Sequence, residues 1–225
     1  MGLEARIDSE SGIFRSMKSE SVTDLSLFRR MSFAPDGTHL CSTNSVLRGK
    51  NIAAMVTRSG WIVKSAAEGG VSLVGHKQPI VSSRHCPYFF KHVARDKDMD
   101  EDDEDVEPDY AMLLALGDKR GFVTVWSTKS KRPIFKLQCS ETRCTITDLS
   151  WGRSSERDLL WLYVSMLDGH VVTLQFKVNE DVNNFLTDDK HARIFRLKYG
   201  IQVEKDGMKM RGIVCGSGSK LIENA

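Results

Sequence analysis

Short apolar runs separated by turn residues make up the chain as far as about residue 177. Several runs alternate apolar and polar residues with the period of two that half-buried β-strands require. Tight turns with proline, glycine or aspartate lie between them, and no long amphipathic helix pattern interrupts them before about residue 180. The pattern predicts an all-β protein with strands within residues 25–33, 51–57, 111–117, 122–126, 144–151, 159–165 and 170–176.

Two sequence units recur along these strands. An apolar run that ends in an aromatic residue just before a turn occurs at 31–37 and again at 149–152. A turn followed by alternating residues occurs at 121–126 and again at 169–176. Repetition at a spacing of roughly 40 to 60 residues is typical of a β-propeller, in which each repeat forms one four-stranded blade. An unrelated antiparallel sandwich remains the alternative.

The character of the chain changes after the last predicted strand. We expect a helix within 181–200, because Thr187 can cap it, Ile194, Leu197 and Phe195 can form its apolar side, and Gly200 can end it. The tail after the helix is expected to be loose. The predicted parts are a flexible N-terminus at 1–14, a partial propeller at 15–177 with blades at roughly 15–65, 70–137 and 138–177, and a helix with its tail at 178–225.

The small net charge conceals a separation of sign along the chain. The whole chain carries +2, but residues 96–109 hold ten acidic residues and one lysine, a net −9, so the rest carries +11. This separation predicts a solvated acidic loop and a basic face elsewhere. Arg29, Arg30, Lys129, Lys131 and Arg132 are candidates for a basic surface that touches DNA, although solvated strand ends explain them equally well.

No set of reactive residues in the sequence matches a catalytic or metal-binding motif. Phosphate-binding loops, the G-x-S-x-G unit and the H-E-x-x-H unit are all absent from it. The six histidines and five cysteines lack the spacing of metal ligands, and the odd, irregular cysteines indicate a reducing compartment. Neither a secretory signal nor an apolar run of about 20 residues is present. We expect no catalysis, no metal, no cofactor and no membrane association.

Several segments, in order along the chain, resemble one known family. FRRMSFAPDG (28–37) and the Gly75-His76 pair look like parts of WD-repeat blades. The more specific units together resemble the last propeller blades of the HIRA/Hir histone chaperone family and the segment that follows them. These units are LGDKRGFVTVWSTKSKRPIF (116–135), ITDLSW (146–151), VSMLDGHVVTLQF (164–176), ARIFRLKYG (192–200) and LIEN (221–224).

The resemblance implies a WD-repeat propeller of which this chain holds about three blades of an expected seven. Three blades cannot close, so we expect a truncated gene product; a partner that covers the open edges is the alternative. It also implies a buried hydrogen-bond network that braces the strands of each blade. The candidates are His76, Asp118, Trp126 and Asp168. We expect these networks to be incomplete, because Arg120 stands at the usual aspartate position and Leu174 at the usual tryptophan position.

The same resemblance implies a non-enzymatic scaffold in a nuclear complex for replication-independent nucleosome assembly, chromatin organisation and transcriptional regulation. Its implied partners are histones H3 and H4, a ubinuclein-like subunit and, through sequence outside this chain, the anti-silencing histone chaperone; DNA is contacted only indirectly. Two alternatives remain. The first is the propeller subunit of the replication-coupled chromatin assembly factor, to which FRRMSFAPDG and HCPYFF (85–90) are also similar. The second is a generic WD-repeat adaptor.

The acidic run is the segment with the clearest candidate partner. Histones are strongly basic, and a flexible polyanion can screen them without a fixed geometry. A disordered insertion kept soluble by its charge explains the run as well. The candidate histone-contacting residues are Asp100, Glu101, Asp102, Asp103, Glu104 and Asp105.

Overall fold

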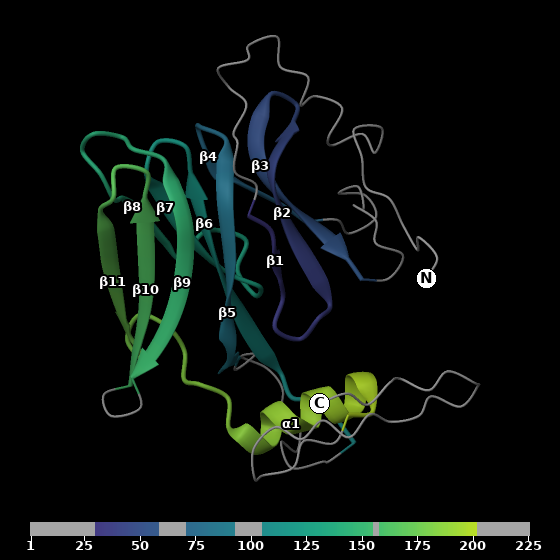
Figure 1. Ribbon diagram of the computed structural model, residues 1–225. Coiled ribbons are helices and arrows are strands. Elements are labelled where there is room, and N and C mark those ends of the chain that lie inside the picture. Colours follow the sequence, from purple (N-terminus) through teal and green to yellow (C-terminus); the bar gives the residue numbers. More distant parts are fainter. Residues whose placement is uncertain (1–29, 59–70, 93–104, 155–157, 202–225) are drawn as a thin grey trace, which may run out of the picture.

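The computed structural model describes residues 30–58, 71–92, 105–154 and 158–201. These residues form three antiparallel β-sheets, each built from strands that follow one another in the sequence, and one helix. The sheets lie side by side, with the helix at one end of them (Figure 1). The predicted all-β class is confirmed.

The first sheet contains, in this order, β1 (Ser32–Phe33), β2 (His39–Leu47), β3 (Lys50–Thr57) and β4 (Ser72–His76). The β2–β3 hairpin turns through Arg48 and Gly49, whose φ angles are 50° and 73°. Two successive positive φ angles are those of a type I′ turn, whose twist matches that of the strands it joins. A register shift between Ser42 and Ser45 marks a bulge in β2.

The second sheet contains, in this order, β5 (Ile80–Lys91), β6 (Tyr110–Asp118), β7 (Phe122–Ser127) and β8 (Phe135–Gln138). The continuous apolar run at 111–117 becomes β6, which is buried along its whole length. Pro87 lies where the register between β5 and β6 shifts, between His85 and Phe89. A proline is tolerated at such an irregularity because it has no N–H to donate to the neighbouring strand.

The third sheet contains β9 (Ile146–Ser154), β10 (Leu159–Met166) and β11 (Val171–Lys177), with β10 in the middle. Each strand pairs with its sequence neighbour in the antiparallel sense. The third sheet therefore follows the same up-and-down path as the first two.

The first strands of the three sheets lie next to one another. Arg30, just before β1, forms a parallel bridge with Ser82 of β5. On the other side of β5, Arg84 Nε donates to the carbonyl oxygen of Leu149 in β9 at 2.9 Å, and Trp151 Nε1 donates to the carbonyl oxygen of Arg84 at 3.0 Å. Up-and-down sheets whose first strands meet in this way are the blades of a propeller. The described residues are therefore a propeller fragment with three blades.

The border between the first two blades lies between β4 and β5. Residues 72–76 hydrogen-bond to β3, with Ile52 opposite Val74 and Asn51 opposite His76. Residues from 70 onward were predicted to begin the second blade, whereas in the structure residues 72–76 complete the first sheet. The difference matters for His76, because it comes from one sheet and its partners come from the next.

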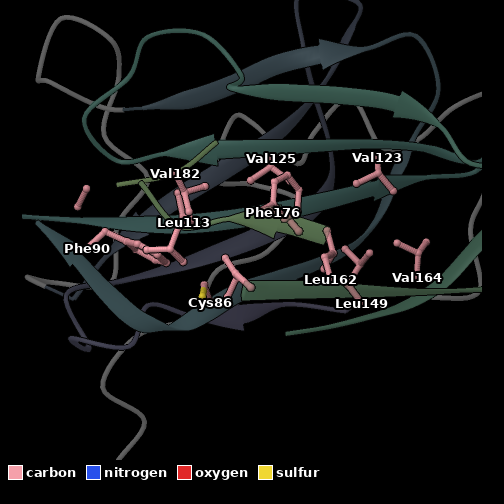
Figure 2. Close-up of a cluster of buried hydrophobic side chains, with 14 of the residues drawn as sticks. Cys86, Phe90, Leu113, Val123, Val125, Leu149, Leu162, Val164, Phe176 and Val182 are labelled. Carbon is pink, nitrogen blue, oxygen red and sulfur yellow. The ribbon is translucent and has the colours of Figure 1, made fainter. Parts of the chain in front are cut away.

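Apolar side chains fill the space between the second and third sheets. Phe90, Leu113 and Val125 of the second sheet face Leu149 and Leu162 of the third (Figure 2). Removing each of these side chains from water stabilises the fold by roughly 1.5–3 kcal/mol. The contact between the sheets is an interior of aliphatic and aromatic groups.

The two sheets approach most closely at Gly117 in β6. A Cβ placed on Gly117 would lie 2.7 Å from Cγ2 of Ile146 and 3.0 Å from its Cβ. Because Ile146 is itself fully buried and branched at Cβ, it has little room to move away. Glycine at this position therefore lets the second and third sheets pack.

The helix α1 (Asp188–Tyr199) follows the last strand. It ends, as expected, at Gly200, which has a φ of 65° and donates its N–H to the carbonyl oxygen of Arg196. Thr187 occupies the cap position but makes no side-chain capping hydrogen bond. Among the described residues, no helix is long and apolar enough to cross a membrane.

The apolar side of α1 differs in part from the expected one. Ile194 is buried, as predicted, but Leu197 is 38% exposed. The rings of His191, Phe195 and Tyr199 instead stack along the helix, and Phe195 contacts Phe89 of β5. Residues four apart share one face of a helix, so this aromatic stripe displaces Leu197 from the contact with the sheets.

Candidate functional site: a buried polar network and two ends of unlike charge

A buried hydrogen-bond network joins the first sheet to the second. His76 Nδ1 lies 2.9 Å from Oδ2 of Asp118, and His76 Nε2 lies 2.8 Å from Oγ1 of Thr124. Trp126 Nε1 donates to the same Thr124 hydroxyl at 2.9 Å. The side chains of His76 and Asp118 are 0% and 1% exposed. Because every member has a partner, the network braces the strands instead of leaving buried polar groups unpaired.

Each member of the network is placed by a strand end or by the alternation of a strand. His76 ends β4, Asp118 ends β6, and Thr124 and Trp126 lie two residues apart on the same face of β7. Asp118 Oδ1 also accepts the backbone N–H groups of Arg120 and Phe122 at 2.8 and 3.0 Å. The aspartate therefore closes the β6–β7 turn and holds the histidine of the neighbouring sheet at once.

The expectation that this network is incomplete is wrong. Arg120 does stand at the position where a blade usually carries aspartate, but Asp118, two residues earlier, supplies the carboxylate. The backbone N–H of Arg120 also donates to that carboxylate, so the turn holds Asp118 in place although Arg120 occupies the usual aspartate position. The sequence analysis also did not single out Thr124; its place two residues before Trp126 in an alternating strand was the available signal.

The structure does not bring Asp168 into this network. Asp168 lies in the exposed β10–β11 turn, where its Oδ1 accepts the backbone N–H of His170 at 3.1 Å. Its Oδ2 lies 3.2 Å from His170 Nδ1. Hydrogen bonds from the backbone and side chain of His170 lower the pKa of Asp168. Asp168 is therefore a turn residue in this fragment.

A second polar cluster, centred on Asp36, fixes the helix to the first two sheets. Tyr110 of β6 donates its hydroxyl to Asp36 Oδ2 at 2.7 Å, and Thr38 donates to Oδ1. From the helix, Lys198 Nζ lies 3.3 Å from Oδ2 of Asp36, and the Tyr199 hydroxyl donates to the Asp36 carbonyl oxygen at 2.5 Å. The sequence analysis read residues 35–37 only as a turn, because nothing in the sequence indicates which distant side chains meet there.

The pKa values in this cluster follow from burial and from the hydrogen bonds. Burial by itself would raise the pKa of Asp36, but hydrogen bonds from Tyr110 and Thr38 and the charge of Lys198 outweigh it and lower that pKa. Burial and the hydrogen bond to Asp36 raise the pKa of Tyr110. Tyr110 therefore remains a neutral donor while Asp36 remains a charged acceptor.

A half-buried histidine, His39, and a buried one, His85, lie next to this cluster. The ring centroids of His39 and His85 are 5.2 Å apart, edge to face. Burial, and then the proximity of His39, lowers the pKa of His85 to about 3. Burial also lowers the pKa of His39. Both rings are therefore neutral near pH 7, and His85 Nδ1 contacts the hydroxyl of Ser32 at 3.1 Å.

Two arginines join the first strands of the sheets. Arg30 Nε donates to the carbonyl oxygen of Thr147 at 2.8 Å, and Arg84 Nη2 contacts Asp148 Oδ1 at 3.1 Å. Arg30 also lies 3.7 Å from the other oxygen of Asp148. Arg30, a candidate for a basic DNA-contacting surface, is thus used in part to hold the third sheet.

The acidic segment is described only from Asp105 onward, so Asp100, Glu101, Asp102, Asp103 and Glu104 lie outside the described residues. Asp105 is exposed. Two later acids are held by lysines: Glu107 lies 3.1 Å from Lys198 of α1, and Asp109 lies 2.5 Å from Lys129. The end of the segment is therefore fixed beside the helix. Within the described ranges no three His, Cys, Asp or Glu side chains are grouped to hold a metal ion.

The chain was compared with known proteins by sequence. No family model matches it. It is 30% identical to Protein HIR1 of Kluyveromyces lactis over 182 residues, which cover 79% of this chain and 19% of that protein. It is 29% identical to Protein HIR1 of Yarrowia lipolytica over 172 residues, which cover 68% of this chain and 15% of the relative.

A third relative, the histone transcription regulator slm9 of Schizosaccharomyces pombe, is 30% identical over 156 residues, which cover 68% of this chain and 16% of the relative. The chain thus spans less than a fifth of the length of these curated relatives. The similarity to several HIR1 proteins agrees with the propeller fragment seen in the structure. The chain belongs to the HIR family.

Proposed function

We propose that this chain is a propeller segment of a HIR-type histone regulator and acts as a non-enzymatic scaffold in the nucleus. Its role is replication-independent assembly of nucleosomes from histones H3 and H4, and through it chromatin organisation and transcriptional regulation. The similarity to HIR1 of K. lactis over 79% of the chain carries the proposal. The name of the slm9 relative, a histone transcription regulator, supports the connection to histones.

The charge at the helix end of the sheets supports a histone contact there. Described residues on the two sides of the acidic run meet at this end: the backbone N–H of His92 donates to the carbonyl oxygen of Asp109. Glu107, also beside the run, lies 3.1 Å from Lys198 of α1. A polyanion at this place attracts basic histone segments through a long-range field that needs no fixed geometry.

The acidic run can be tested with purified chain and H3–H4 tetramers. We expect neutralisation of Asp100, Glu101, Asp102, Asp103, Glu104 and Asp105 to their amides to weaken histone binding at least about tenfold at low salt, because binding rests on charge attraction. The matched control neutralises six other acids: Glu141, Asp158, Glu180, Asp181, Asp188 and Asp189. Equal weakening by both variants would show that only net charge matters and would remove the role of the run.

The wider complex can be tested by recovering partners of the chain from nuclear extract. Recovery of a ubinuclein-like subunit together with H3 and H4 supports the HIR scaffold, and the anti-silencing chaperone is expected only if sequence beyond this chain is added. Recovery of the replication-coupled assembly subunits instead would assign the chain to that pathway. Recovery of neither would leave a generic WD-repeat adaptor.

A further inference from the structure

The end of the sheets opposite α1 consists of turns that are linked to one another. We call it the turn end; it comprises residues 48–50, 77–79, 119–121, 139–145 and 167–170. Asn51 Nδ2 donates to the carbonyl oxygen of Lys77 at 3.1 Å, and the N–H of Lys119 donates to the carbonyl oxygen of Pro79 at 3.0 Å. Thr145 donates its hydroxyl to the carbonyl oxygen of Lys119 at 2.8 Å. The turns of all three sheets thus form one continuous surface.

This surface is strongly basic. Two acids lie on it, Glu141 and Asp168, and Asp168 is already engaged by His170. Six basic side chains outnumber them: Arg48, Lys50, Lys77, Lys119, Arg120 and Arg143. All of these except Lys119 are exposed. The excess of positive charge therefore faces solvent.

The cations of the turn end outnumber the carboxylates that could pair with them. At the helix end, Lys129, Lys177 and Lys198 each lie within ion-pair distance of a carboxylate, whereas no described carboxylate lies that close to Lys131 or Arg132. Among the described residues, no carboxylate lies within that distance of Arg48, Lys50, Lys77, Arg120 or Arg143. Like charges held together without counter-charges raise the local potential and favour a polyanionic partner.

The composition of the turn end indicates which polyanion fits. Its residues include no aromatic side chain on which unpaired bases could stack, and single-stranded nucleic acids are bound largely through such stacking. Exposed lysines and arginines on the turns of neighbouring sheets instead suit the phosphates of a duplex, which proteins neutralise with these side chains. We propose that the turn end binds the phosphate backbone of double-stranded DNA without reading its sequence. This direct contact goes beyond the proposed histone function and does not rest on it.

The test measures binding of the full chain to a short labelled duplex of mixed sequence by fluorescence anisotropy, over about 50 to 200 mM salt. The test variant carries Lys77→Glu, Arg120→Glu and Arg143→Glu. The matched control carries Lys91→Glu, Lys177→Glu and Arg196→Glu, exposed cations away from the turn end that change net charge equally. We expect the test variant to lose more than about tenfold in affinity and about three units of the log–log salt slope, and the control to lose little.

Three results would overturn the proposal. The first is wild-type chain that does not bind the duplex at low salt. The second is equal loss in the test variant and the control, which would make the attraction a property of net charge. The third is a test variant that no longer binds an acidic peptide but binds the duplex as the wild type does. That result would assign the surface to an acidic protein. Alanine at the same three positions repeats the comparison if the glutamate variant fails to fold.

Discussion

The two junctions between neighbouring sheets are built in different ways. Between the first and second sheets, His76, Asp118 and Thr124 form a buried polar network with a few apolar side chains around it. Between the second and third sheets, the interior is a large apolar cluster that includes Leu149, Leu162 and others. Neighbouring blades of similar architecture are thus held together by a polar network at one junction and by apolar packing at the next.

The difference teaches what each junction can specify. Apolar packing contributes in proportion to the area removed from water and tolerates exchange of similar side chains. A buried polar network contributes only when every donor has an acceptor, so it admits one arrangement of the two sheets. The first junction sets the register between the blades, whereas the second mainly supplies stability.

The largest effect is expected from breaking the polar junction. Asp118→Ala leaves His76 and the backbone N–H groups of Arg120 and Phe122 without their acceptor. Because each buried donor left unpaired costs about 1–3 kcal/mol, we expect the free energy of unfolding to fall by about 4 kcal/mol in a urea titration. Asp118→Asn, which keeps the shape and one oxygen, should lose less than half as much. Equal loss in both variants would contradict the network's role.

At the apolar junction, the effect of a substitution on the free energy of unfolding should depend on side-chain volume alone. Leu162 is fully buried, so Leu162→Ala should lower the free energy of unfolding by about 3 kcal/mol through lost burial and an unfilled cavity. Leu162→Met nearly conserves volume and should cost less than about 1.5 kcal/mol. If Leu162→Met proved as costly as Leu162→Ala, the second junction would be as specific as the first.

The buried ring of His85, which contacts Ser32 of the first sheet, should also make stability depend on pH. Burial lowers the pKa of His85 to about 3, whereas in the unfolded chain it lies near 6.5. The unfolded state therefore binds a proton first as pH falls, and stability decreases from pH 6.5 toward pH 3, by about 2 kcal/mol at pH 5. His85→Gln should flatten this dependence in urea titrations at several pH values. His170→Gln, at an exposed turn, serves as the control and should leave the slope intact.

The smallest effect on the free energy of unfolding is expected where α1 contacts the first sheet at Asp36. Tyr199→Phe removes the hydroxyl that donates to the Asp36 carbonyl oxygen but keeps the ring beside Phe195. One lost hydrogen bond at a half-buried site should lower the free energy of unfolding by about 1 kcal/mol. Hydrogen exchange should quicken in α1 and leave β10 unchanged. Equal acceleration in both would show that the helix is not a separate unit from the third sheet.

The alternating strands and their turns were largely predictable from the sequence. The runs at 51–57, 122–126, 159–165 and 170–176 became β3, β7, β10 and β11, because a period of two buries one face of a strand wherever it packs. The continuous apolar run at 111–117 became β6, which is buried on both faces. The end of α1 at Gly200 was also predicted, since a glycine readily adopts the positive φ found there. These features depend on residues close in sequence.

The candidate sites were predictable only in part. His76, Asp118 and Trp126 were named from the sequence, but Thr124, which joins His76 to Trp126, was not, and completion of the network depended on how the β6–β7 turn folds. The helix-docking cluster was not predicted, because Asp36 and Lys198 are 162 residues apart and neither lies in a motif. The prediction that Leu197 lies on the apolar side of α1 was wrong for the same reason. The side of α1 that faces the sheets is the one whose Phe195 contacts Phe89 of β5, and the sequence does not show that contact.

The sequence by itself determined the strand class, the turns, the charge separation and the resemblance to HIR proteins, because propensity, alternation and motifs are properties of neighbouring residues. Only the tertiary structure decided that the exposed cations Arg48, Lys77 and Arg143 gather at one end of the sheets. It further decided that lysines hold Glu107 and Asp109 at the other end. It also decided that one sheet junction is polar and the next apolar. These outcomes depend on which residues of different strands and turns meet, and the register and packing of the sheets set that.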